Sequence, residues 1–381
     1  MILKKMGLLL LFSSLLGACS KNEDHPHSLR HPLLQKNYSA AVGLKNLGST
    51  CFANAVHKLL WADSRFSHPH LATTPIQRLF FSLMSQLDQN WKIVSENLDD
   101  SGFSKNGYET ELNAFYDALI QSNGGSAEID VDHSNLRRDQ ADARVYLDKL
   151  IELLQLNEIT PGFYESTQPV FDDGHRNKLN PDLLTDRDHL GNALPVPLPH
   201  LRMSGLSIHS PRVNSIEDAI REQFDTPERM DGNNRPRRSD NDQPEAADKY
   251  TYLTLRDGAL PPSQMLLMLS RLEADHVSKS FKKISATQQI ELRFHRQILN
   301  AVNLVRVVEI SATSSTKAYH LKGVVIHKGT TSGGHYYTYL LEDQQWFLHD
   351  DSRVAPIQKE QEASLFDDIE TNGYLFLYSE K

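Results

Sequence analysis

The chain has 381 residues, 39% of them hydrophobic, and a formal net charge of -9 from 40 basic and 49 acidic side chains. This length and composition suit one large or two ordinary globular domains and exclude general disorder. The acidic balance gives no basic footprint for nucleic acid, so we expect no nucleic-acid partner, whereas a partner protein with a basic surface is compatible with it.

The N-terminus has the pattern of a processed leader. Lys4 and Lys5 precede a short apolar run that ends near Leu16, and small residues follow up to Cys19. The run is shorter than the roughly 20 apolar residues of a membrane span and predicts a signal peptide over residues 1–18. Because the segment from Leu16 to Cys19 resembles the lipobox of bacterial lipoproteins, we expect a lipid anchor on Cys19. An ordinary signal peptide with a chance cysteine is the alternative.

The segment 19–37 follows as a polar tether. It contains Pro26 and Pro32 and is mainly polar, which is typical of linkers. Its histidines are interpreted as solvated side chains rather than as metal ligands. The folded catalytic domain is therefore expected over residues 38–381.

Cys51 stands where a helical pattern begins. From Phe52 to Leu60 the apolar residues recur at helical spacing, which predicts an amphipathic helix with Cys51 in its first turn and Ser49 or Thr50 as its cap. The partial positive charge of a helix N-terminus favours a thiolate, so Cys51 is a candidate nucleophile. A small buried residue at a helix start is the alternative.

The rest of the chain predicts an α+β organisation. Helical patterns cover residues 73–91 and 141–154, and the less hydrophobic stretch 161–250 contains one short helix begun by Ser215 and an expected loop over 229–249. From about residue 250 onward, short β-patterned runs separated by turn residues predict an antiparallel sheet.

Residue types for thiol hydrolysis gather near the C-terminus. His335 follows two glycines and opens a predicted strand, and Asp350 and Asp351 end the next one. Because adjacent antiparallel strands place the start of one beside the end of the other, His335 and Asp350 can meet. A catalytic cysteine needs a histidine as base and acid and a third group that orients the histidine. Taken singly, a structural histidine and a turn are the alternatives.

Two composite motifs resemble those of the ubiquitin-specific proteases. "GLKNLGSTCFANAVHKLL", residues 43–60, is similar to the cysteine box of that family, and "GGHYYTYLLEDQQWFLHDDSRV", residues 333–354, is similar to its histidine box. A weaker similarity lies between them in "QADARVYLDKLIELL", residues 140–154. The resemblance spans about residues 42–380 and is thin between 155 and 250.

The resemblance implies a papain-like cysteine protease fold of the α+β class, with a helical thumb, a β-rich palm and reduced fingers. It makes Cys51 the nucleophile, His335 the general base and acid, and Asp350 the third member of the triad. It also implies that Asp351 assists and that Asn46 donates a hydrogen bond to the oxyanion.

For substrate binding, the resemblance implies a narrow channel that admits a tail ending in Gly-Gly. The residues carried over to this channel are Gln140, Asp142, Gly334 and Tyr336. The chain lacks the two C-x-x-C pairs that often hold zinc in the family's fingers, so no metal and no cofactor are expected. Departures from the family pattern stand at Ser49, Ala53, His57, Val145, Tyr146 and His349, and none removes a triad atom.

The implied activity is that of a cysteine-type deubiquitinase, which hydrolyses the isopeptide or peptide bond at the C-terminal glycine of ubiquitin or a ubiquitin-like modifier. Together with the leader, it implies an exported, membrane-anchored and monomeric bacterial lipoprotein, at the cell surface or delivered to a eukaryotic host, that acts on host conjugates. A cell-envelope cysteine peptidase would explain the leader directly and is one alternative. A catalytically weak ubiquitin-binding lipoprotein is the other.

Overall fold

The structure of the protein is a computed structural model that describes residues 37–63, 72–96, 106–122, 140–154, 163–172, 185–187, 193–195, 205–232, 235–236, 243–255, 260–271, 278–302 and 305–380. All of these belong to one unit, Lys36–Lys381. The expected signal peptide, Cys19 and nearly all of the tether lie outside the described residues, so those expectations stay predictions.

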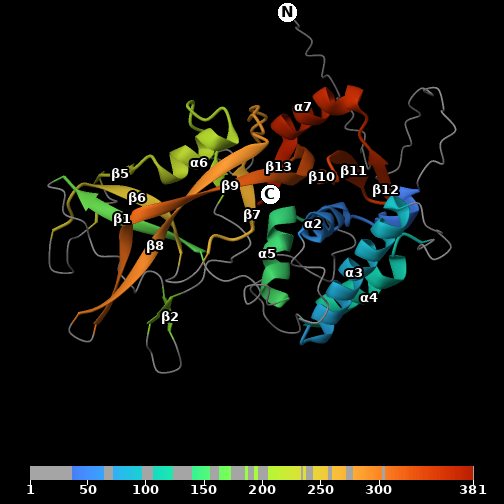
Figure 1. The fold of residues 1–381 in the computed structure, drawn as a ribbon, viewed down its shortest axis with the longest axis horizontal. Helices are drawn as coiled ribbons and strands as arrows, with labels where there is room; N and C mark the ends of the chain where they lie inside the picture. The colour runs from blue at the N-terminus through green and yellow to red at the C-terminus, as the bar shows by residue number, and fades with distance from the viewer. Residues whose placement is uncertain are drawn as a thin grey trace, which may run out of the picture. The chain divides into compact units, whose positions relative to one another are not determined.

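The N-terminal part of this unit is helical (Figure 1). Its helices are α1 (Tyr38–Val42), α2 (Cys51–Trp61), α3 (Pro75–Ser95), α4 (Glu109–Ser122) and α5 (Ala143–Leu153). Thr74 caps α3 in a capping box with Gln77, whose side chains accept from backbone N–H groups that the helix start leaves free. Pro75 occupies the first turn, where its missing N–H costs no hydrogen bond. None of the described helices is both long enough and apolar enough to cross a membrane.

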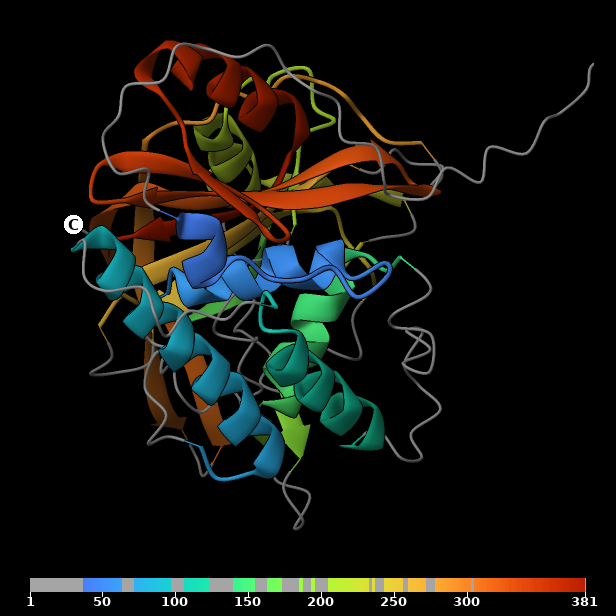
Figure 2. The ribbon, with the colours of Figure 1, turned by 90° about the vertical axis from the view of Figure 1, so that its right-hand side faces the viewer.

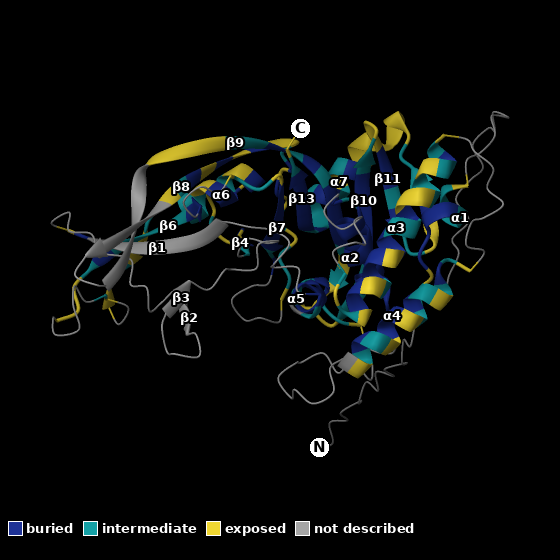
Figure 3. Cartoon of the chain, turned by 60° about the horizontal axis from the view of Figure 1, so that its bottom comes forward, coloured by how far each residue is buried: buried dark blue, intermediate teal, exposed yellow. Residues whose placement is uncertain are grey.

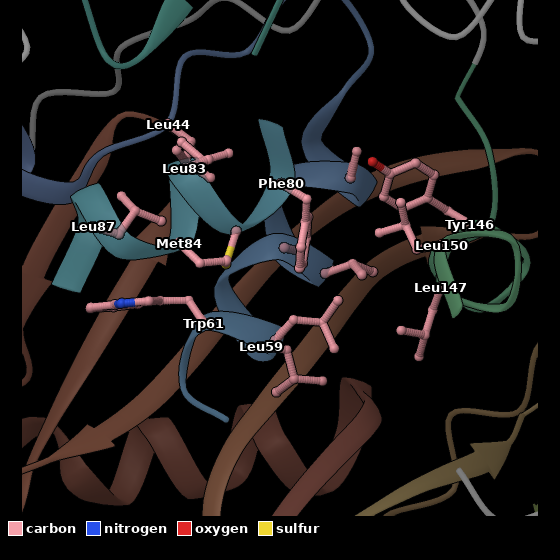
Figure 4. Close-up of a cluster of buried hydrophobic side chains, with 14 of the residues drawn as sticks. Leu44, Leu59, Trp61, Phe80, Leu83, Met84, Leu87, Tyr146, Leu147 and Leu150 are labelled. Atoms are coloured by element: carbon pink, nitrogen blue, oxygen red, sulfur yellow. The ribbon is translucent and has the colours of Figure 1, made fainter. Parts of the chain in front are cut away.

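Helices α2, α3 and α5 pack their apolar faces together. Figure 4 shows this contact, with side chains from α2, α3, α5 and the loop before α2 directed toward one another. The labelled residues are Leu44, Leu59, Trp61, Phe80, Leu83, Met84, Leu87, Tyr146, Leu147 and Leu150. Helices α3 and α4 keep an exposed outer face, yellow in Figure 3. The predicted amphipathic periodicity therefore corresponds to one shared core.

The C-terminal part is built on a large sheet. Among the described residues, the sheet has eleven strands. Seven of them follow the order β1-β6-β8-β9-β10-β11-β12, while β13 pairs with β9 and β7, β4 with β7, and β5 with β6. The strands are β1 (Phe163–Phe171), β4 (Leu206–Ser207), β5 (Glu228–Met230), β6 (Ala247–Leu255), β7 (Gln264–Ser270), β8 (Gln289–Val302), β9 (Val305–Thr330), β10 (Gly333–Glu342), β11 (Gln345–Asp350), β12 (Arg353–Pro356) and β13 (Gly373–Ser379). Strands β2 (Thr185–Arg187) and β3 (Ala193–Pro195) form a separate pair. The sheet is mixed rather than purely antiparallel, because β6 and β8 run parallel, as do β4 and β7.

Helices cover both faces of this sheet near β9 and β10 (Figure 2). Helix α2 lies on one face, while α6 (Ile216–Phe224) and α7 (Glu362–Asn372), preceded by the 3-10 turn η7 (Lys359–Gln361), lie on the other. Alternation along β9 explains the two layers: Val325 belongs to the core under α2, and Val324 and Ile326 belong to the core under α6 and α7.

The stretch 161–250 contains strands that the sequence did not predict. Strand β1 pairs with β6 in register from Phe163 opposite Leu255. The loop expected over 229–249 is wrong at both ends, because β5 ends at Met230 and β6 begins at Ala247. Arg229, whose guanidinium lies 2.7 Å from Asp172 and 3.2 Å from Asp248, joins these polar strands. Strands stabilised by ion pairs lack the apolar alternation that identifies a strand in a sequence.

Two histidines, His57 of α2 and His349 of β11, are buried in the core. Burial and the neighbouring Lys58 lower the pKa of His57 to about 3, and the same two causes lower the pKa of His349 well below its usual value. The Nε2 atom of His57 lies 2.9 Å from the hydroxyl of Tyr146. Both ring nitrogens of His349 are buried without a hydrogen-bond partner among the described residues. Both imidazoles are therefore neutral in the folded protein.

The free energy of unfolding is expected to fall as the pH decreases below about 6.5, because the unfolded chain then protonates histidines that the folded protein keeps neutral. The substitution His349→Phe removes one of these neutral histidines. It is expected to reduce the decrease in the free energy of unfolding between about pH 8 and about pH 5 by about 2 kcal/mol. Urea unfolding at the two pH values measures this loss. The exposed His209 offers the control His209→Phe, and an equal loss in wild type and His349→Phe would contradict the prediction.

Candidate active site

Cys51 is the first residue of α2 and is 2% exposed. The turn before it includes Gly48 at a φ of 116°, a conformation that favours glycine. Thr50 holds the N-cap position without a side-chain cap bond. Its hydroxyl instead accepts from the Leu47 N–H at 2.9 Å and donates to Asn46 Oδ1 at 3.2 Å. Thr50 therefore occupies the predicted N-cap position, but its hydroxyl does not accept from an N–H group of the helix. It forms hydrogen bonds within the preceding turn instead.

The structure brings His335 and Asp350 together through the pairing of β10 with β11. The ladder places Thr338 opposite His349, and the Nε2 atom of His335 lies 2.6 Å from Asp350 Oδ1. The hydrogen bond with Asp350, followed by the interaction with the Cys51 thiol, raises the pKa of His335 to about 10.

The second ring nitrogen of His335 is available to the thiol. Nδ1 is buried and has no hydrogen bond of ordinary geometry among the described residues, while Cys51 still contributes to the raised pKa of the ring. An imidazole made this basic can take a proton from Cys51 and return it to a leaving group.

Asp351 ties the turn before Cys51 to the end of β11. Its two carboxylate oxygens accept from the side-chain amides of Asn46, at 2.9 Å, and Asn54, at 2.8 Å, and its backbone carbonyl accepts from Leu44 N–H at 2.9 Å. Burial raises the pKa of Asp351, and the two amide hydrogen bonds oppose that increase. The side chain therefore acts as a clamp between two segments rather than as a second partner of His335.

The same clamp fixes the orientation of Asn46. Its Oδ1 accepts from the N–H of Thr50 at 3.0 Å, and its Nδ2 donates to Asp351. An amide nitrogen has two hydrogens, so one remains for an oxyanion beside Cys51. This orientation suits the predicted donor role of Asn46.

A cavity of about 610 Å³ begins at Gln140. The amide nitrogen of Gln140 lies 3.9 Å from the sulfur of Cys51. The walls of the cavity include the start of α5 and the turn between β9 and β10, and Tyr336 lines it. Tyr336 stacks on His327 with ring centroids 4.3 Å apart, and burial lowers the pKa of His327 to about 4, so a neutral imidazole supports the tyrosine.

Asp142 lies at this cavity but its carboxylate is engaged by the protein. It accepts from the N–H of Arg144 at 2.8 Å and from the hydroxyl of Tyr374 at 3.0 Å, and it lies 3.4 Å from the hydroxyl of Tyr336. It therefore starts α5 and holds two tyrosines of the wall. A direct contact of Asp142 with substrate remains a prediction.

Three residues that support the site were not predicted from the sequence. Asn54 lies inside the cysteine box, and its spacing of three from Cys51 on the helix was the available signal. For His327 and Lys279 the sequence offered no such signal, because these residues reach the site through strand pairing and packing. The ammonium group of Lys279 donates to the carbonyl groups of His327 and Gly329, which fixes the strand before the turn.

Within the part of the chain that the structure describes, His335, Asp350 and Asp351 could offer three metal ligand atoms within 4.8 Å of one another. The His335 and Asp350 atoms are already at hydrogen-bond distance, and Asp351 binds two amides. The group is therefore interpreted as a hydrogen-bonded triad with its clamp.

Comparison with known proteins places this geometry in context. Residues 42–378 match the protein family described as ubiquitin carboxyl-terminal hydrolase. Ubiquitin C-terminal hydrolase 13 of Arabidopsis thaliana is 23% identical over 339 residues, which are 84% of this chain and 26% of that protein. Probable ubiquitin carboxyl-terminal hydrolase 8 of Schizosaccharomyces pombe is 40% identical over 63 residues, which are 16% of this chain and 13% of that protein. The chain thus spans about a quarter of the length of the first relative.

Solved structures share the fold. The SAGA DUB module Ubp8/Sgf11/Sus1/Sgf73 bound to monoubiquitin matches with a TM-score of 0.59 and 17% identity, over 91% of this chain and 71% of the matched chain. The same module bound to ubiquitin aldehyde matches with a TM-score of 0.58 and 17% identity, over 93% and 72%. The predicted α+β fold is confirmed.

Replacing Asp351 by Ala should lower kcat by about 10- to 100-fold with a smaller change in KM, because Asn46 loses its orientation. Steady-state hydrolysis of an amide or ester formed at the C-terminus of ubiquitin or a ubiquitin-like modifier measures kcat and KM. The double variant Asn46→Ala/Asp351→Ala should be little slower than Asn46→Ala alone, since both changes remove one donor. Fully additive losses would show that Asp351 acts independently of Asn46.

Proposed function

The chain belongs to the ubiquitin carboxyl-terminal hydrolase family, and from this premise we propose that it is a cysteine-type deubiquitinase that cleaves the bond after the C-terminal glycine of ubiquitin or a ubiquitin-like modifier. One arrangement carries the proposal: Cys51 starts a helix beside His335, and His335 lies 2.6 Å from Asp350. The family match over residues 42–378 supports it.

The proposed reaction uses these groups in sequence. His335 takes the thiol proton, and the sulfur of Cys51 attacks the carbonyl carbon of the terminal glycine while Asn46 donates to the oxyanion. The tetrahedral intermediate collapses, His335 gives its proton to the departing lysine amine, and a thioester remains on Cys51. Water then attacks the thioester with His335 as base, which releases the modifier and restores the thiol.

The strand that carries His335 requires a glycine at position 334. A Cβ atom on Gly334 would lie 2.3 Å from the carbonyl oxygen of Lys328, so the strand beside His335 can be formed only by glycine without a local shift. The adjoining cavity leads away from Cys51 along α5. The family match and the ubiquitin bound in two structures of like fold support ubiquitin or a close relative as substrate. We propose that the enzyme acts as a monomer.

The alternatives receive less support. A cell-envelope peptidase would need no site for a folded modifier, whereas the family match here extends over both the helical part and the sheet. A binding protein without activity would need no hydrogen bond between His335 and Asp350.

We further propose that the leader makes the protein an exported lipoprotein that meets a eukaryotic host. This part rests on the sequence of residues 1–37, with its lysines, short apolar run, small residues before Cys19 and polar tether. Anchoring at Cys19 and chemistry at Cys51 would then be independent.

The deubiquitinase proposal predicts that purified protein hydrolyses ubiquitin-aminomethylcoumarin and that Cys51→Ala lowers kcat/KM by at least about 10³-fold. A small residue replaces a small one, so circular dichroism and the unfolding midpoint should change little. The matched control is Cys19→Ser, which alters the other of the two cysteines and should keep full activity. Equal activity of Cys51→Ala and wild type would exclude Cys51 as the nucleophile.

The anchoring proposal predicts that expression in a bacterium yields a mature protein that begins at Cys19 and carries acyl chains. Cys19→Ser should prevent acylation and move the protein out of the membrane fraction, because the polar tether without acyl chains does not bind the membrane. Mass spectrometry of the mature N-terminus is the measurement. An intact leader or an unmodified Cys19 would show that the lipoprotein proposal is wrong.

A further inference from the structure

The side chain of Gln140 satisfies both backbone groups of Gly334. Its Nε2 donates to the carbonyl oxygen of Gly334 at 2.6 Å, and its Oε1 accepts from the N–H of Gly334 at 2.9 Å. Gly334 directly precedes His335, and the same Nε2 lies 3.9 Å from the sulfur of Cys51. One exposed carboxamide therefore bridges the strand that carries the histidine and the space in front of the thiol.

Gly334 lies on a segment of β10 whose second edge is open. Strand β10 pairs with β9 from Gly333 onward, but its pairing with β11 begins only at Thr338. The N–H and C=O of one residue in an antiparallel ladder point to the same side. Because Gln140 takes both groups of Gly334, these groups point away from β9, toward Gln140.

An extended chain that reaches Cys51 along this edge needs the same two groups. A residue in the extended conformation presents one N–H and one C=O on one side, and these can pair with the C=O and N–H of Gly334 as an added strand does. The carboxamide of Gln140 offers one donor and one acceptor in the same place. It imitates a peptide unit of the incoming tail.

We propose that Gln140 is a specificity-determining residue that competes with the substrate tail for Gly334 and is displaced when the tail binds. We call its two hydrogen bonds to Gly334 the Gln140 latch. The inference rests on the proposed function, because the displacing ligand is the extended Gly-Gly end of a modifier. A tail that forms both hydrogen bonds with Gly334 replaces the latch without loss, whereas a ligand that forms one of them leaves the other backbone group of Gly334 without its partner.

The latch also lowers the apparent affinity for every substrate. Only the fraction of enzyme with Gln140 released can bind a tail, so the apparent dissociation constant rises as that fraction falls. Removing the side chain is therefore expected to strengthen binding. A residue that held the substrate directly would give the opposite sign.

The test compares wild type, Gln140→Ala and Gln140→Glu on ubiquitin-aminomethylcoumarin. The latch predicts that Gln140→Ala lowers KM about fivefold with kcat within about twofold of wild type. Gln140→Glu keeps the acceptor for the Gly334 N–H and loses the donor to its carbonyl, so KM should also fall. The matched control is Gln89→Ala, which removes an exposed glutamine of α3 and should change neither constant.

A second measurement needs no substrate. The amide proton of Gly334, followed by NMR hydrogen exchange in the free protein, should be protected in wild type and exchange at least about tenfold faster in Gln140→Ala. A raised KM or a kcat reduced beyond about twofold in Gln140→Ala, or equal exchange in the two proteins, would overturn the latch while leaving the deubiquitinase proposal intact. If wild type hydrolyses no ubiquitin substrate, the proposed function is wrong and the latch falls with it.

Discussion

Burial of α2 against β10 is the constraint on which the site depends. Every residue of α2 is buried, and the hydroxyl of Thr338 on β10 donates to the carbonyl of Ala55 on α2 at 2.9 Å. This contact sets how far along the strand the helix begins. Because Cys51 starts the helix and His335 stands three residues before Thr338 on the strand, the same packing that closes the core places the thiol beside the imidazole.

A second constraint acts on the polar groups around that contact. The adjacent residues Asp350 and Asp351 serve different segments: Asp350 orients His335, and Asp351 holds the amides of Asn46 and Asn54. Asp351 adopts a φ of 50°, an uncommon value for a residue with a side chain. This turn lets consecutive carboxylates point to two different partners, so the base and the proposed oxyanion donor share one anchor.

Three histidines show how the surroundings of one residue type determine its protonation. A carboxylate partner raises the pKa of His335 to about 10, whereas burial lowers the pKa of His327 to about 4 and that of His57 to about 3. His335 is therefore the proton carrier of the three at neutral pH. The other two support tyrosines as neutral rings, since His327 stacks on Tyr336 and His57 contacts Tyr146.

The sequence by itself determined features whose contacts lie close together along the chain, at most 15 positions apart. The start of α2 at Cys51 and the meeting of His335 with Asp350 follow from helical periodicity and a short hairpin. The tertiary structure alone decided contacts between distant segments: Asp351 with Asn46, 305 positions apart, and Gln140 with Gly334, 194 positions apart. It also decided the pairing of the polar strands in 161–250. No local pattern encodes such contacts, because each depends on how the helical part and the sheet pack together.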